Sequence, residues 1–423
     1  MERFLGRPKF FWNKDRRTNN LRQVYMDHGA TTPVDPRVKE EMITYFSDEY
    51  GNASQMYQLG QHAHMALELA RERLAKLIQA NPGEIIFTSG GTEADNAALK
   101  GIMLTKRTEK NHIITSTIEH AAILNTCKYL EKQGIKVTYL PVNKHGLINL
   151  EDLKTAITKD TALVSIMHAN NEIGTIQPIK AISEITHDAG AIFHTDAVQT
   201  VGKISVDVQE MNIDLLSMSS HKIYGPKGVG ALYKKEGIKL EPLIHGGGHE
   251  HGYRSGTENI AGIVGFGKAA SIASNSLFEE KKRLAKMRDQ LITNLLTIED
   301  SRLNGHPTKR LPHNTNFSFK FIEGEALILR LDDRGIYAST GSACSTKKLK
   351  ASHVLLAIGL RPEIAHSSLR LTLGRGNTPE DVNYVLKIIP EVIQELREMS
   401  AFTKETEEYV MQLKDPNNHD SEN

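Results

Sequence analysis

Cysteine is scarce in this chain, which has two cysteines, Cys127 and Cys344, among 423 residues. Two cysteines cannot build the disulfide framework of a secreted scaffold, and their scarcity favours a reducing compartment, so we expect the cytoplasm. Long apolar runs are missing as well: none has the length of a membrane span, and the N-terminus lacks the apolar core of a signal peptide. We therefore expect no membrane among its partners.

A strong charge of either sign is also absent. Lys and Arg number 52 against 51 Asp and Glu, which gives a formal net charge of +1. No overall field favours binding of nucleic acid, so we expect small molecules or proteins as partners. Basic residues do gather in residues 1–23, where an organellar presequence is an alternative, but Glu2, Asp15 and the scarcity of serine count against it.

The chain is long enough for two or three domains. Short apolar runs separated by helical or turn segments indicate an α/β fold with a mainly parallel sheet and helices on both faces. An amphipathic helix over 278–298 is expected to link this sheet to a smaller α+β unit. The runs expected to form strands are 84–88, 112–116, 137–142, 162–168, 191–194, 215–218 and 229–233. The expected division is a basic arm over 1–23, a large domain over 24–275, a small domain over 276–402 and a polar tail over 403–423.

Two polar residues follow apolar runs in the middle of the chain. Asp196 follows the run 191–194, and Lys222 follows the run 215–218. The carboxyl ends of strands are where open α/β sheets bind ligands. A lysine amine and a carboxylate are what pyridoxal phosphate requires, one to hold its aldehyde and one to keep its ring nitrogen protonated. Taken alone, such a pair is far more often a turn cap and a surface lysine.

A glycine turn lies between a strand and a helix near residue 90. The run 84–88 leads into Ser89, Gly90, Gly91 and Thr92, after which helical character begins. Backbone N–H groups at a helix N-terminus favour a phosphate, and glycine allows close approach. The pattern therefore indicates an anion site, although many such turns hold no ligand.

Together, a series of motifs in this order resembles the IscS/NifS-type cysteine desulfurases from about residue 24 to residue 400. The motifs are YMDHGATTPVDPR, FTSGGTEADNAALKG, EHAAILNT, MHANNEIGTIQPI, HTDAVQTVGK, SSHKIYGPKGVGALY, GGGHEHGYRSGTENIAGIVGFGKA, STGSACS and AHSSLRLTLGR. The resemblance implies the aspartate aminotransferase-like fold of pyridoxal-phosphate enzymes (fold type I) and a homodimer. It also implies removal of sulfur from L-cysteine, which leaves L-alanine and a persulfide on an enzyme cysteine.

The resemblance further implies how the cofactor is held. Lys222 would form its Schiff base, Asp196 would pair with its ring nitrogen, and Gln199 would bond its phenolic oxygen. Asn171 would contact the ring or the substrate. The phosphate would be bound by Gly91, Thr92, Ser219 and His221, and by the partner subunit's Thr257.

Catalytic roles follow from the same resemblance. Cys344, in a loop of small residues, would take up the sulfur, and the neighbouring lysines could lower its pKa or attract an acidic partner. His120 would stack on the ring and move protons. Arg370 would bind the substrate carboxylate, which suits its bidentate fork.

No intrinsic metal is expected. His245, His249 and His251 could suggest a metal site, but the family carries this glycine-rich turn without one. Cys344 could transiently ligate an iron–sulfur cluster together with a scaffold partner. The expected sulfur acceptor is an iron–sulfur scaffold protein, with tRNA thiolation as a further destination.

Some features leave alternatives open. Tyr57 stands where the family often has a histidine, so the contacts of that loop are expected to differ from those of the family. A selenocysteine lyase would have a cysteine loop of different sequence, and an aminotransferase would need no cysteine at position 344. A non-catalytic scaffold is the alternative from another class, and it would have no need to keep Lys222, Asp196, Cys344 and Arg370 together.

Overall fold

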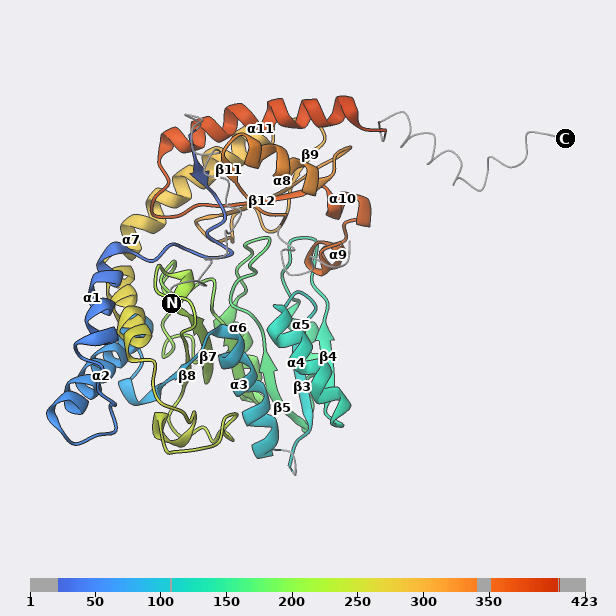
Figure 1. The fold of residues 1–423 in the computed structure, drawn as a ribbon. Helices are drawn as coiled ribbons and strands as arrows, with labels where there is room; N and C mark the ends of the chain where they lie inside the picture. The colour runs from blue at the N-terminus through green and yellow to red at the C-terminus, as the bar shows by residue number, and fades with distance from the viewer. Residues whose placement is uncertain (1–21, 107–108, 341–350, 402, 404–423) are drawn as a thin grey trace, which may run out of the picture.

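The computed structural model describes residues 22–106, 109–340, 351–401 and 403 (Figure 1). Its main element is a seven-stranded sheet with the strand order β2-β8-β7-β6-β5-β3-β4. Strands β4, β3, β5, β6 and β7 run parallel, while β8 is antiparallel to both β7 and β2. The strands are β2 (Ile85–Thr88), β3 (His112–Ser116), β4 (Lys136–Leu140), β5 (Thr161–Ser165), β6 (Ile192–Asp196), β7 (Leu215–Ser219) and β8 (Gly230–Lys234). The predicted α/β fold with a mainly parallel sheet is confirmed, and each strand lies within a few residues of its predicted run.

Helices cover both faces of this sheet, as its apolar strands require. Neighbouring residues of a strand point to opposite faces, so Ile113 packs with α3 (Gly91–Lys106) and α4 (Ala121–Lys132), whereas Ile114 packs with the opposite layer. That opposite layer contains α2 (Gln58–Ile78), α6 (Ile179–Asp188) and the first part of α7. Helices α1 (Pro36–Ser47) and α5 (Leu150–Ala156) complete the layers.

Helix α7 (Ile260–Leu295) joins the two parts of the molecule (Figure 1). The sequence predicts only its second half, because the first half is rich in small apolar residues and has no polar face. Most residues from Ala261 to Ala273 are buried against the large sheet's helices, where Gly267 lies so close to α2 that a Cβ would come within 2.5 Å of the Ala70 Cα. Leu284 and Leu291 instead pack in the core of the smaller unit.

The smaller unit has its own sheet and its own core. Its three-stranded sheet has the order β12-β10-β9, formed by β12 (Ser368–Thr372), β10 (Asn314–Phe319) and β9 (Ser301–Leu303). Helices α8 (Gly324–Asp333) and α11 (Pro379–Met399) cover it, and Thr378 is the N-cap of α11, as predicted. The first strand of the chain, β1 (Val24–Tyr25), pairs with β11 (Ile336–Tyr337), so this start of the predicted large domain belongs to the smaller core.

The segment after residue 350 returns to the large sheet. Ser352 is the N-cap of α9 (His353–Ala357), and Val354 and Leu355 pack against Ile118 and Met167. Helix α10 (Pro362–His366) then leads back to β12. No helix in the described ranges has both the length and the apolarity needed to cross a membrane.

Candidate active site

A cavity of about 270 Å³ opens at the carboxyl ends of the parallel strands. This is the edge at which open α/β sheets bind ligands. The cavity brings together nearly all the predicted site residues that the structure describes, although they come from distant parts of the chain. They are Gly91, Thr92, His120, Asn171, Asp196, Gln199, Ser219, His221, Lys222 and Arg370.

Lys222 lies in a short 3-10 turn (Ser220–Lys222) directly after β7. Its Nζ donates hydrogen bonds to the carbonyl oxygens of Gly29 and Ala30, at 2.6 and 2.7 Å. Tyr224, just beyond it, has a left-handed backbone with φ 69°, and its N–H is held by the hydroxyl of Thr32 at 2.8 Å. The lysine amine is therefore fixed in the cavity by the loop that follows β1.

Asp196 is the last residue of β6, and its Oδ1 accepts the N–H of Val198 at 2.9 Å. Burial raises its pKa, while the nearby His120 and Lys222 oppose that shift. A second acid, Asp95 of α3, lines the same cavity and is 1% exposed. Burial and then the charge of Asp196 raise the pKa of Asp95 well above its usual value. The rise is the larger for Asp95, because Asp196 has the nearby His120 and Lys222 to oppose it, and Asp196 is therefore the acid better placed to face a cation.

The N-terminus of α3 and the end of β7 form the opposite end of the cavity. A Cβ on Gly91 would lie 2.7 Å from Val198 Cγ2, so glycine keeps this end open. His221 accepts or donates at Nδ1 to the Thr31 hydroxyl at 3.1 Å. Burial, and then the charge of Lys222, lowers the pKa of His221 to about 4, so its ring is neutral at pH 7.

Arg370 enters the cavity from β12 of the smaller unit. Its side chain is 3% exposed, and it donates to the Asn171 carbonyl oxygen at 3.0 Å and to Asp27 Oδ1 at 2.8 Å. Its Nε has no hydrogen-bond partner among the described residues. The guanidinium therefore has spare donors beside the cavity, where a carboxylate could bind.

His120 and its neighbour Glu119 are fixed where α4 begins. His120 is the N-cap of α4, and its Nδ1 accepts the N–H of Ala122 at 3.2 Å, so Nε2 carries the proton when the ring is neutral. Glu119 accepts the Ser116 hydroxyl at 2.6 Å and the N–H of Met167 at 3.0 Å, and burial raises its pKa to about 8. His120 thus caps α4 and also places its ring in the wall of the cavity.

Three predicted features lie elsewhere. Thr257 is exposed and lies outside the cavity of its own chain. This position is compatible with the expectation that Thr257 serves the cavity of a partner subunit. Tyr57 is the N-cap of α2 and is 57% exposed. Cys344 lies outside the described residues.

Sequence reasoning missed several residues of the cavity. Gly29 and Ala30 supply the carbonyls that hold Lys222, and Asp95 and Met167 line the wall. All four occur within the motifs quoted above, but only a buried acid one turn into a helix, as at Asp95, gives a signal that could have been noticed.

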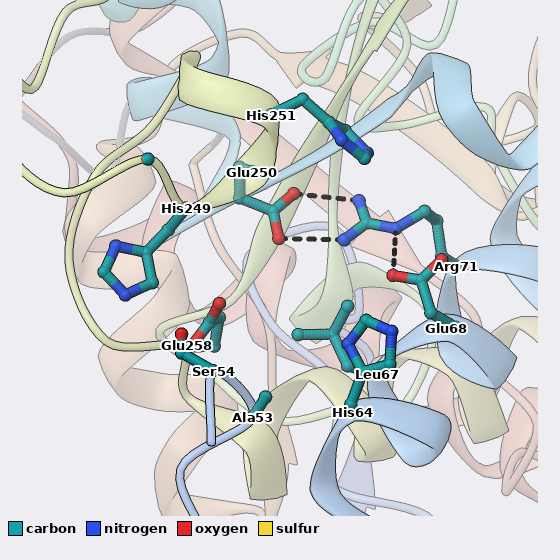
Figure 2. A pocket seen from close by; sticks show the side chains of 11 residues that line it. Ala53, Ser54, His64, Leu67, Glu68, Arg71, His249, Glu250, His251 and Glu258 are labelled. Atoms are coloured by element: carbon teal, nitrogen blue, oxygen red, sulfur yellow. Dashed lines mark hydrogen bonds and ion pairs between the residues drawn. The ribbon is translucent and has the colours of Figure 1, made fainter. Parts of the chain in front are cut away.

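A second cavity, of about 330 Å³, lies beside the glycine-rich turn and contains histidines that could suggest a metal. Figure 2 shows His64, His249 and His251 on different sides of it. Its wall is held by Arg71, which donates to both carboxylate oxygens of Glu250 at 2.8 and 2.9 Å. Among the residues that the structure describes, no group of three or more His, Cys, Asp or Glu side chains is placed to hold a metal ion.

The residues of the first cavity fit pyridoxal phosphate. Its phosphate needs several donors, which the start of α3, Ser219 and His221 provide beside an open Gly91. Asp196 is an acid that can pair with a ring nitrogen, and Lys222 is an amine for an aldehyde. Such a cavity, at the edge of this sheet, defines the class of pyridoxal-phosphate enzymes with the aspartate aminotransferase-like fold.

Known proteins narrow this class to one family. The aminotransferase class-V family matches residues 24–385. A cysteine desulfurase IscS of Methanosarcina thermophila is 54% identical over 380 residues, which cover 90% of this chain and 94% of that protein. A cysteine desulfurase IscS of Clostridium botulinum (strain Hall) is 55% identical over 382 residues, covering 90% and 96%. A solved NifS-like protein has a TM-score of 0.84 at 42% identity, covering 89% of this chain and all of that one.

The chain therefore belongs to the aminotransferase class-V family and, within it, to the IscS/NifS-type cysteine desulfurases. It is accordingly a pyridoxal-phosphate-dependent enzyme, and the resemblance read from the motifs is confirmed.

Proposed function

We propose that this cavity, together with Cys344, removes sulfur from L-cysteine, releases L-alanine and keeps the sulfur as a persulfide on Cys344. The observation that carries the proposal is the meeting of Lys222, Asp196 and Arg370 in one cavity of a chain from a desulfurase family. A lysine and an acid hold the cofactor, and an arginine selects a substrate that carries a carboxylate.

When bound, pyridoxal phosphate withdraws electrons from the substrate Cα. Asp196 would keep its ring nitrogen protonated, and Gln199 would donate to its phenolic oxygen. Arg370 binds the substrate carboxylate, while Asn171 contacts the ring or the substrate. The amine of Lys222, released from the carbonyls of Gly29 and Ala30, takes the proton from Cα and supplies protons as alanine forms. His120 would stack on the ring and move protons to and from the substrate.

The sulfur transfer itself falls to Cys344. Its thiolate attacks the substrate sulfur, so a sulfur–sulfur bond forms while the bond between that sulfur and Cβ breaks. The electron pair of the broken bond stays with the carbon skeleton, which takes up protons and leaves as alanine. The second cysteine cannot do this, because Cys127 is fully buried in α4 and burial raises its pKa to about 12.

The oligomeric state, the sulfur acceptor, the cellular location and the domain division are also proposals. The enzyme acts as a homodimer in which the partner subunit's Thr257 reaches the phosphate, and Thr257 is exposed as that requires. The persulfide passes to an iron–sulfur scaffold protein or another acceptor, and the scarcity of cysteine supports a cytoplasmic location. The division into a large and a small domain at residues 275 and 276 is retained as a proposal, supported by the two cores that α7 connects.

Reduction with borohydride tests the role of Lys222. In the purified enzyme the reduced cofactor is expected on the peptide that contains Lys222, and Lys222→Ala should trap none and release no alanine from L-cysteine. Lys227→Ala, at an exposed lysine of the same loop, serves as the control and should behave as the wild type. Alanine release that survives in Lys222→Ala would overturn the assignment.

A further inference from the structure

Lys203 lies beside the active-site cavity without any role in the account given so far. It follows β6 in a turn, and its Nζ lies 3.4 Å from Gln199 Oε1 and 3.2 Å from His313 Nε2. His313 comes from the smaller unit, just before β10, and is 2% exposed. Within the part of the chain that the structure describes, these two hydrogen-bond partners are both uncharged side chains, since His313 is held neutral by its burial and by the nearby charge of Lys203.

A lysine in this place is costly. Burial, followed by the positive charges of Lys222 and Arg370, lowers the pKa of Lys203 to about 7. A partly buried cation beside two other cations is unfavourable for the fold, and an apolar side chain would avoid that cost. Such a group is found where it serves an anion that binds nearby, and the cavity next to it is lined by cofactor-binding residues.

The hydrogen bond from Lys203 fixes which way the Gln199 amide points. The ammonium form of Lys203 has three N–H donors and no acceptor, so the Gln199 group that faces it is the acceptor, Oε1. The amide nitrogen then faces the cavity, where Nε2 donates to the Gly29 carbonyl oxygen at 3.0 Å. The same carbonyl accepts the hydrogen bond from Lys222 Nζ. If the amide were turned round, two donors would meet at Lys203 and two acceptors at Gly29.

We propose that Lys203 is a positioning residue: it holds the amide oxygen of Gln199, so that the amide nitrogen is presented as a donor to the phenolic oxygen of the bound cofactor. This inference rests on the proposed role of Gln199. Lys203 also places a positive charge on the side of the cavity where that oxygen carries negative charge. Both effects favour the state of the cofactor that has lost a proton.

The pH dependence of the cofactor's absorbance measures this effect without any turnover. Lys203→Met removes the donor and the charge, and it is expected to raise the pH midpoint of the absorbance change by about one unit. Lys203→Arg keeps the N–H donor and the positive charge, so its midpoint should be close to that of the wild type. Lys180→Met, at an exposed lysine of α6, is the matched control and should shift nothing. The thermal midpoint of Lys203→Met is expected to stay the same or rise, because a partly buried cation next to two other cations is removed.

A double-mutant cycle shows whether Lys203 acts through Gln199. Gln199→Ala alone should raise the pH midpoint of the absorbance change. In the Gln199→Ala protein, the shift caused by Lys203→Met should be less than half of the shift that Lys203→Met causes in the wild type. Lys203→Gln, which keeps an N–H donor and loses the charge, should shift the midpoint less than Lys203→Met does.

Each contrary result has a distinct meaning. An unchanged midpoint in Lys203→Met with a shifted one in Gln199→Ala would overturn the inference and leave the role of Gln199 standing. The inference would also be overturned if Lys203→Met shifted the midpoint equally in the wild type and in Gln199→Ala. Equal shifts in Lys203→Met and Lys203→Gln would overturn it too, because the charge of Lys203 alone would then account for the effect. No shift in Gln199→Ala would instead overturn the proposed role of Gln199.

Discussion

Arg370→Lys is expected to weaken the binding of L-cysteine while the chemistry of the reaction continues. In the wild type the guanidinium uses one N–H for the Asn171 carbonyl and one for Asp27, and its Nε has no partner among the described residues. Lysine retains the positive charge, and with it an ion pair to Asp27, but it loses the planar fork that can hold a carboxylate by two bonds.

The magnitude follows from that fork. A hydrogen bond to a charged group contributes about 1.5–3 kcal/mol, and each 1.4 kcal/mol changes affinity about tenfold. Loss of one such bond to the substrate carboxylate should raise KM for L-cysteine about 10- to 100-fold, with a much smaller change in kcat.

Alanine release at varied concentrations of L-cysteine measures both constants. Arg302→Lys is the matched control, because Arg302 is an exposed arginine of β9 in the same sheet, and its KM should equal that of the wild type. A thermal midpoint for each variant shows whether the fold is kept. A KM within about twofold of the wild type in a folded Arg370→Lys would refute the assignment of Arg370 to the substrate carboxylate.

Two further predictions concern Glu119 and the cysteines. Burial raises the pKa of Glu119 from 4.5 to about 8, so its contribution to stability is full below pH 4.5 and is lost as the pH rises to about 8. Gln cannot ionise, so the free energy of unfolding of Glu119→Gln should fall less between pH 5 and 8 than that of the wild type, by roughly 1.4 kcal/mol per pH unit. An equal fall in the two proteins would contradict this. A thiol reagent should modify Cys344 alone in the native enzyme and both cysteines after unfolding, because Cys127 is buried; peptide mapping that finds modified Cys127 in the native enzyme would contradict the packing of α4.

The positions of Asp196 and Lys222 could be predicted because they depend on local patterns. Each follows a short apolar run, and the structure places Asp196 at the end of β6 and Lys222 just after β7. Parallel strands buried on both faces are continuous apolar runs, which makes their ends easy to find. The motifs then indicated the family and, with it, which other residues would meet in the cavity.

Contacts between distant segments could not be predicted from the sequence. Nothing in residues 24–25 indicates that β1 pairs with β11 at the far end of the chain, and the small residues in the first half of α7 give no helical period because helices surround them. The link between Ser352 and Glu172, at 2.5 Å, joins residues 180 positions apart. Lys203 likewise reads as a surface lysine until the fold brings His313 beside it.

The central claim is that Cys344 takes the sulfur of L-cysteine, and the mass of the protein after one turnover tests it most directly. Enzyme mixed with L-cysteine in the absence of reductant should gain the mass of one sulfur atom on the peptide that contains Cys344, and it should release one alanine per sulfur gained. Cys344→Ala should retain the cofactor's absorbance and gain no sulfur, while Cys127→Ala should behave as the wild type. Alanine released at the wild-type rate by Cys344→Ala, or sulfur found on Cys127, would contradict the account.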